Sequence, residues 1–137
     1  MAKSLSHHDA LIYVMVTTAA ADGTITDGEL RRIGSIVSQL PVFADFDVED
    51  LVPTAEACGK VLAGKDGLTK VLDIIAKSLP EKLYETAYAL AVEVAAADLK
   101  VGREEVRLLE MVSDKLDLSK LVIAAIERGA RARHRMK

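Results

Sequence analysis

The most informative feature of this sequence is a segment that occurs twice. The copies cover residues 19–30 and 95–106, at a constant offset of 76 residues. Apolar residues outside the copies correspond at the same offset, as Val16 does to Val92. Each copy is expected to form an apolar helix, a four-residue elbow and an amphipathic helix. Two such helical hairpins, with their apolar helices packed together, predict an all-α fold with approximate two-fold symmetry.

The composition also favours helices. The chain has 137 residues, of which 50% are apolar but only 4% aromatic, and it contains only three prolines. That length is typical of one domain, and the scarcity of turn-forming residues disfavours an all-β fold. We therefore expect a single domain over residues 1–137, with an aliphatic core over about 6–128 and a basic C-terminal tail over 128–137.

Capping residues and periodicity divide the chain into helical segments. Ser6 is the expected N-cap of the first helix, and Thr26 with Glu29 forms a capping box at the start of the second. Pro53 and Pro80 are each expected to start a helix, and the helix from Pro80 should be the longest. The expected segments are 7–21, 27–40, a turn from 47, 53–62, 68–79, 80–97, a helix ending near 116, and a last helix capped by Asp117 or Ser119.

The first elbow, residues 22–25, invites comparison with a calcium-binding EF-hand loop. Gly23 and Glu29 fit the sixth and twelfth loop positions. The first and third positions would be Thr18 and Ala20, which supply no carboxylate, and the second copy has Leu99 in place of the glycine. These differences disfavour an EF-hand.

Four acidic residues nevertheless recur in the two copies, namely Asp22 and Glu29, then Asp98 and Glu105. Helix capping and turn formation explain all four, and we favour that interpretation. The alternative needs the two elbows to lie side by side, because four clustered carboxylates would then repel unless a hard divalent cation lay between them.

Charge is unevenly distributed along the chain. The net charge is −3, but residues 128–137 contain five basic and no acidic residues, which leaves −8 for the remainder. This balance disfavours general nucleic-acid binding. The tail is interpreted as a frayed helix end, and contact with a membrane surface or nucleic acid is the weaker alternative. Its basic residues are Arg128, Arg131, Arg133, Arg135 and Lys137.

No residue pattern indicates an enzyme. Cys58 is the single cysteine, so no intramolecular disulfide can form, and it is expected to be a small buried helix residue. The three histidines lie near the chain ends, and His7 with His8 is interpreted as part of a solvated N-terminus rather than a metal pair. Paired carboxylates acting in acid–base catalysis are the distant alternative.

The N-terminal region bears on localisation. An apolar run over 10–16 follows a stretch in which only Lys3 is basic, whereas a signal peptide has a more basic start. The alanines at 19–21 could mimic a cleavage site, which keeps a signal peptide as the alternative. No run reaches the length of a membrane-spanning helix, so the expected localisation is cytoplasmic.

The motif at 20–29, with its degenerate copy at 96–105, resembles the tellurite-resistance TerB-like family. That family also includes the N-terminal domain of membrane-anchored DnaJ-type co-chaperones. The similarity extends over roughly residues 8–128. It implies a compact bundle of about seven helices, an association with stress responses, and a divalent cation (Ca²⁺, Mg²⁺, Mn²⁺ or Zn²⁺) at an acidic elbow cluster. The positions that match the family's acids are Asp22, Glu29, Asp98 and Glu105.

The second copy departs from this pattern in two ways. Leu99 replaces the elbow glycine, and Arg103 stands at the position that corresponds to Asp27. Arg103 lies beside the expected cluster and could pair with Asp22 or Asp98, which would replace the cation altogether.

Together these features predict a non-enzymatic, stress-associated helical domain that acts by binding a protein partner. The acidic run at 45–50 is either a surface for a basic partner segment or a solvated loop. A specific nucleic-acid partner is not expected, and a homodimer is an open alternative. The alternative function is a sensor of divalent metal ions, and a carboxylate-based hydrolase is a more distant one.

Overall fold

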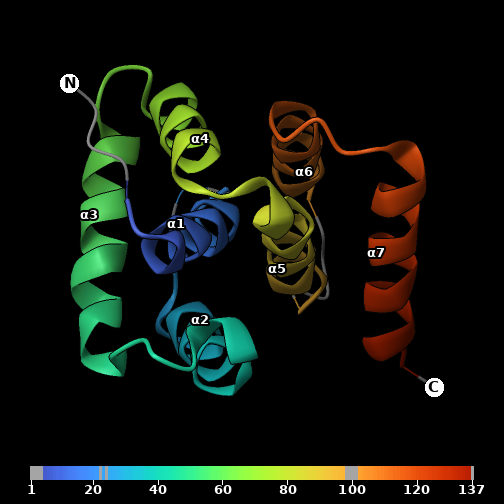
Figure 1. Ribbon diagram of the computed structural model, residues 1–137, viewed down its shortest axis with the longest axis horizontal. Helices are drawn as coiled ribbons and strands as arrows, with labels where there is room; N and C mark the ends of the chain where they lie inside the picture. The colour runs from blue at the N-terminus through green and yellow to red at the C-terminus, as the bar shows by residue number, and fades with distance from the viewer. Residues whose placement is uncertain (1–4, 22, 24, 98–101, 137) are drawn as a thin grey trace.

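The computed structural model describes residues 5–21, 23, 25–97 and 102–136, and within them it contains seven α-helices, three short 3₁₀ helices and no strand. The helices form a compact bundle with α1 near its centre (Figure 1). This confirms the predicted all-α fold. The elements are α1 (His7–Ala19), α2 (Asp27–Gln39), η1 (Pro41–Phe43), η2 (Val48–Asp50), α3 (Leu51–Ala63), α4 (Gly67–Ser78), η3 (Glu81–Leu83), α5 (Tyr84–Ala97), α6 (Arg103–Lys115) and α7 (Lys120–Arg133).

Helix α1 is the centre of the hydrophobic core. Almost its whole circumference is buried, as expected for a helix that is apolar on every side. Its two buried threonines both have polar contacts: Thr18 Oγ1 donates a hydrogen bond to the Val14 carbonyl of the same helix, and Thr17 Oγ1 lies 3.6 Å from Cys58 Sγ of another helix. Helices α3, α4 and α5 all pack against α1 (Figure 1).

Helix α5 is the second core helix, and it makes the most extensive contacts that α1 has with any element. Its alanines, such as Ala87 and Ala91, are fully buried and leave room for close approach of the two backbones. The predicted packing of the two apolar helices of the repeat is therefore confirmed. Each is flanked differently, because α3 and α4 cover α1 whereas α7 covers α5.

Two helix starts differ from the sequence prediction. Pro80 does not begin the long helix, because it is the N-cap of the 3₁₀ helix Glu81–Leu83 and α5 begins at Tyr84. Pro53 is the third residue of α3 rather than the first, since the helix continues directly from η2 at Leu51. Proline lacks a backbone N–H, which is tolerated anywhere in the first turn of a helix.

The predicted caps of α1, α2 and α7 are confirmed. The Ser6 hydroxyl accepts a hydrogen bond from the Asp9 amide at 3.1 Å. The Ser119 hydroxyl accepts one from the Val122 amide, so Ser119 rather than Asp117 caps α7. The turn expected from Asp47 is η2, and the Glu49 amide donates a hydrogen bond to the Asp47 carboxylate at 3.0 Å.

The prediction of a solvated N-terminus is wrong for His8, which is only 9% exposed. Its Nε2 lies 2.9 Å from the Val42 carbonyl oxygen and 3.1 Å from Asp45 Oδ1. Its ring also packs against Phe43 and Phe46. His8 therefore attaches the segment that follows α2 to the start of α1, a long-range contact that local sequence patterns do not reveal.

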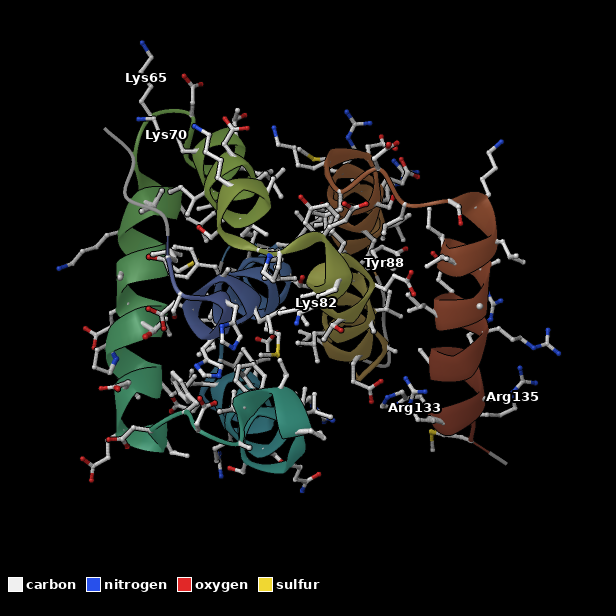
Figure 2. All side chains as sticks on the ribbon, in the orientation of Figure 1. Lys65, Lys70, Lys82, Tyr88, Arg133 and Arg135 are labelled. Atoms are coloured by element: carbon white, nitrogen blue, oxygen red, sulfur yellow. The ribbon has the colours of Figure 1, made fainter. Side chains whose placement is uncertain are left out.

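Polar contacts join α7 to α5 near Tyr88 and near Arg133, both labelled in Figure 2. The buried Tyr88 hydroxyl donates a hydrogen bond to Glu127 Oε2 at 2.6 Å. Burial raises the pKa of Tyr88, and this hydrogen bond raises it further. Farther along, Glu93 accepts from Arg133 at 2.7 Å and lies 2.8 Å from His134 Nε2. The helix therefore does not fray at residue 128 but remains ordered to Arg133.

We expect Glu93→Gln to destabilise the protein by about 1 kcal/mol at neutral pH, because a partly exposed charged pair is lost. Burial alone would raise the pKa of Glu93, but the hydrogen bonds from Arg133 and His134 outweigh it and lower that pKa below its ordinary value of 4.5. The contribution of Glu93 is complete above the unfolded-state pKa and is lost as the pH falls through the lower folded-state pKa.

Urea denaturation midpoints measured between neutral and acid pH test this expectation. The midpoints of the wild type and of Glu93→Gln should converge below the ordinary glutamate pKa. A constant difference across that range would contradict the assigned role of Glu93.

Within the described residues, no helix is both long and apolar enough to cross a bilayer.

Candidate functional site

The first elbow contains Gly23, the one glycine among the described residues that has a positive φ. Gly23 has φ +109°, a conformation that side chains strongly disfavour, and its amide donates a hydrogen bond to the Ala20 carbonyl. The predicted capping box then starts α2. The Glu29 amide donates to Thr26 Oγ1 at 3.1 Å, and the Thr26 amide donates to Glu29 Oε1 at 2.9 Å.

The second copy retains half of this capping arrangement. Gly102 stands where Thr26 stands in the first copy, so it has no side chain that could accept a hydrogen bond. Its amide still donates to Glu105 Oε1 at 3.3 Å, and Glu105 is buried. Both glutamates of the repeat are therefore capping residues, as the favoured interpretation predicted.

A groove of about 620 Å³ opens beside the first elbow. Its walls come from the end of α1, from α3, from the start of α4 and from α6, the helix that follows the second elbow. An ion pair between Lys115 and Asp73 joins α6 to α4, and the hydrogen bond from Lys115 lowers the pKa of Asp73. We call this feature the elbow groove; it is lined by Thr17, Ala20, Ala21, Gly23, Ile25, Gly59, Leu62, Ala63, Leu68, Glu104, Arg107, Leu108 and Met111.

Most of the groove lining that the structure describes is apolar, and the charged side chains of this described lining come from one helix. Glu104 and Arg107, both exposed, lie on the first turns of α6. The apolar side chains come mainly from the other walls, including Leu62 and Leu68. Such a surface suits apolar groups of a ligand, with a charge of either sign accommodated at the α6 side.

Cys58 lies behind the groove rather than in it. The thiol is fully buried beside Thr17, and burial raises its pKa to about 11 despite the opposing contact with Thr17. It is therefore protonated at neutral pH and inaccessible, which makes it a poor nucleophile. This observation agrees with the predicted role as a small core residue.

The residues predicted for the cation site are only partly within the described structure. Asp22 and Asp98 lie outside the described residues. Glu29 and Glu105 are placed, and each uses Oε1 for a capping hydrogen bond. Asp27 is exposed in the first turn of α2. Among the described residues, no group of three or more His, Cys, Asp or Glu side chains is close enough to hold a metal ion.

The donor chemistry suits a hard cation, because carboxylate oxygens are the ligands that Ca²⁺, Mg²⁺ and Mn²⁺ prefer. A capping hydrogen bond leaves the second carboxylate oxygen of Glu29 without a hydrogen bond among the described residues. The described acids do not form a complete coordination shell by themselves. A cation would therefore require Asp22 and Asp98 in addition to Glu29 and Glu105.

Arg103 is the first residue of α6 and is exposed. The ion pair predicted for it involves Asp22 or Asp98, so it also lies outside the described residues. Within the described part of the chain, Arg103 makes no ion pair.

Sequence reasoning identified the elbows but missed the groove beside them. The groove depends on how α3, α4 and α6 are placed around the end of α1, which no local pattern encodes. One signal was present in the sequence. Gly59 lies inside a helix, where glycine is disfavoured. The structure places it on the wall of the groove, so this unusual glycine marked the position of the groove.

Comparison with known proteins agrees with this architecture. The family model described as tellurite resistance protein TerB matches residues 8–128, which is most of the chain. The chain therefore belongs to the TerB family. No curated protein and no solved structure matched the chain. The match ends within α7, which continues to Arg133.

Proposed function

We propose that this TerB-family chain is a non-enzymatic, stress-associated domain that binds an apolar segment of a partner protein in the elbow groove. The observation that carries the proposal is the groove itself, which has a volume of about 620 Å³ and a mainly apolar lining. An open groove with an apolar lining is the kind of surface that receives the apolar anchors of an amphipathic helix. The association with stress rests on family membership.

The expected partner segment combines apolar anchors with basic residues. The chain without its last ten residues has a net charge of −8, and Glu104 lies on the groove wall. Asp27 and Glu29 are close in sequence to the lining residue Ile25. The net negative charge of this part of the chain favours the approach of a basic segment, and the apolar lining supplies affinity.

Gly59 supports this proposal. An ideal Cβ at this position would meet no atom within 4 Å, so the fold itself does not require a glycine there. Glycine inside a helix costs about 1 kcal/mol relative to alanine. A groove that must stay open for a ligand explains why a small residue on this wall is useful.

The variant Gly59→Trp tests the groove directly, because an indole on this wall would occupy part of it and the Cβ that carries the indole has room. Helical peptides selected for binding to the wild type should combine apolar and basic residues. They should bind Gly59→Trp at least about tenfold more weakly, as measured by fluorescence anisotropy. Gly59→Ala is the matched control and should bind as the wild type does. Equal binding of the peptides to Gly59→Trp would contradict a role for the groove.

Groove chemistry also supports a non-catalytic role. The lining contains neither histidine nor cysteine, and the neighbouring Cys58 thiol is held protonated by burial. Nucleophilic catalysis generally pairs an accessible nucleophile with a positioned base. The groove is therefore better suited to binding than to bond cleavage.

A second candidate function is the sensing of a divalent cation at Asp22, Glu29, Asp98 and Glu105. The specific observation in its favour is that the capping hydrogen bond of Glu29 leaves its second carboxylate oxygen without a hydrogen bond among the described residues. A cation held there would link the first turn of α2 to the first turn of α6. When bound, the cation would offset the electrostatic repulsion between the carboxylates, and the four acidic side chains would be its ligands.

Melting temperatures of the wild type and of Glu29→Gln, each measured with and without metal ions, distinguish cation binding from helix capping. Glutamine also completes a capping box, so the metal-free variant should melt close to the wild type. An ion at about 100 times its dissociation constant should stabilise the wild type by about 2.7 kcal/mol. That shift should be lost in Glu29→Gln.

The melting series would use chelator-treated protein with Ca²⁺, Mg²⁺, Mn²⁺ or Zn²⁺ added singly. Glu29→Ala is the second variant, and it should melt early in every condition because the cap is lost. If no ion changes the melting temperature of the wild type, these acids act only as caps and the sensor function is excluded.

A further inference from the structure

The outward face of α7 has no partner within the described structure. Leu121 is 81% exposed, and Ala124 and Ala125 beside it are also exposed. Arg128 and Arg131 follow at helical spacing, so one side of α7 is apolar at its start and basic at its end. We call this surface the basic helix face; it consists of Leu121, Ala124, Ala125, Arg128, Arg131 and Arg135.

The ion pair of Arg133 does not neutralise this face. Arg133 turns toward α5 and binds Glu93, whereas Arg135 lies on the far side of α7 (Figure 2). Arg128, Arg131 and Arg135 make no ion pair within the described residues. Three arginine side chains are therefore presented to solvent beside exposed apolar residues.

A complementary surface lies on the end of the connection between α2 and α3 and on the first turns of α3. Residues 45–56 contain five acidic residues and no basic one, and all five are exposed. Val48 is 52% exposed and Val52 is 49% exposed in the same segment. We call this surface the acidic face; it consists of Asp45, Asp47, Val48, Glu49, Asp50, Val52 and Glu56.

We infer that the basic helix face of one molecule docks on the acidic face of a second copy of this chain. Each face combines exposed apolar side chains with a block of charge of one sign, and the two signs are opposite. Apolar contact supplies affinity and the charges set the orientation. Leu121 meets Val48 and Val52 in this arrangement, while the arginines meet the carboxylates.

The position of the two faces makes the contact intermolecular. Helices α3 and α7 lie at opposite ends of the longest axis of the molecule (Figure 1). A basic helix face therefore cannot reach the acidic face of its own chain. The two interacting surfaces differ, so a pair of molecules joined by one contact still has one free basic helix face and one free acidic face. Further copies can bind to these free faces.

A second copy fits better than a polyanion or a membrane. The rest of the chain carries −8, which repels nucleic acid and anionic lipid as a whole. The basic helix face has only one large apolar side chain, Leu121, whereas interfacial helices bury several. It also has no aromatic residue on which bases could stack. The acidic face offers both the charge and the apolar groups that the basic helix face lacks.

Sedimentation velocity of the full chain at about 50 mM and about 500 mM salt is the first test, since salt screens contacts between exposed charges. We expect concentration-dependent association that weakens at high salt. Two double variants should each raise the dissociation constant of self-association at least about tenfold. They are Arg128→Glu with Arg131→Glu, and Glu49→Lys with Glu56→Lys. None of these four side chains makes a hydrogen bond within the described residues, and circular dichroism checks that the variants fold.

The decisive measurement mixes the two double variants. Each should be monomeric alone, and an equimolar mixture should associate, because every face then meets a face of opposite charge. The quadruple variant should associate with itself for the same reason. The control Lys65→Glu with Lys70→Glu reverses two charges outside both faces and should associate as the wild type does (Figure 2).

Three results would overturn the inference. The first is a wild type that stays monomeric at millimolar concentration and low salt. The second is association that persists unchanged in both double variants, or a mixture that fails to restore it. The third is a wild type that remains monomeric while it binds phosphatidylserine vesicles or single-stranded DNA through Arg128 and Arg131.

Discussion

Replacing Leu11 with alanine is expected to lower the free energy of unfolding by about 2–5 kcal/mol. Leu11 is 0% exposed in the middle of α1, the helix against which α3, α4 and α5 pack. The substitution removes buried methyl groups and leaves a cavity that neighbouring helices can close only in part. This is a large fraction of the roughly 5–15 kcal/mol by which a typical domain is stable.

The control for this change is the same substitution at an exposed leucine. Leu121→Ala removes the same atoms from a side chain that is 81% exposed, and we expect a change within about 0.5 kcal/mol. Chemical denaturation of both variants at low protein concentration makes the comparison. Similar losses at the two positions would show that α1 is not the centre of the core.

Gly67→Ala is expected to destabilise the protein by about 2–4 kcal/mol, because the added methyl group has no space. An ideal Cβ at Gly67 would lie 2.2 Å from the Leu62 carbonyl oxygen and 2.5 Å from the Val61 carbonyl oxygen. Both atoms belong to the backbone of α3, so no side-chain rotation can relieve the contact. The turn between α3 and α4 would have to open, which would also disturb the elbow groove.

Gly59→Ala is the matched substitution with the opposite expected sign. Its Cβ would meet nothing within 4 Å, and alanine is the better helix former, so the variant should be about 0.5–1 kcal/mol more stable. Thermal or urea denaturation of the two variants separates a packing effect from a general effect of glycine. Equal changes in both variants would contradict the close packing of α3 and α4.

Much of the fold was predictable because its signals are local. The capping box of Thr26 and Glu29 and the serine caps each depend on residues within one helical turn. The burial of α1 follows from a helix that is apolar on every side. The repeat added one long-range prediction, the packing of α1 against α5. Both helices are apolar on nearly every side, so each must be buried and each can cover the other.

The features that could not be predicted depend on tertiary contacts. His8 is polar and close to the N-terminus, yet Val42, Asp45 and two phenylalanines enclose it. Pro80 precedes a 3₁₀ turn that leads directly into α5, and a proline at a helix start is compatible with either kind of first turn. For His8 the local pattern suited two outcomes, and residues distant in sequence selected one.

The candidate site shows the same division. The elbow acids were identified from the repeat, and the capping roles of Glu29 and Glu105 are confirmed. Cation binding stays a prediction, since Asp22 and Asp98 lie outside the described residues. The groove was not predictable, because its walls come from four helices whose relative placement no motif specifies.

The most direct test of the proposed function is an NMR titration of ¹⁵N-labelled protein with a peptide selected for binding. We expect chemical-shift changes at amides of the first elbow region, of α3 around Gly59 and of the first turns of α6, because these segments line one groove. Changes confined to α7 or to the acidic face, with the amides of the groove unmoved, would contradict the account.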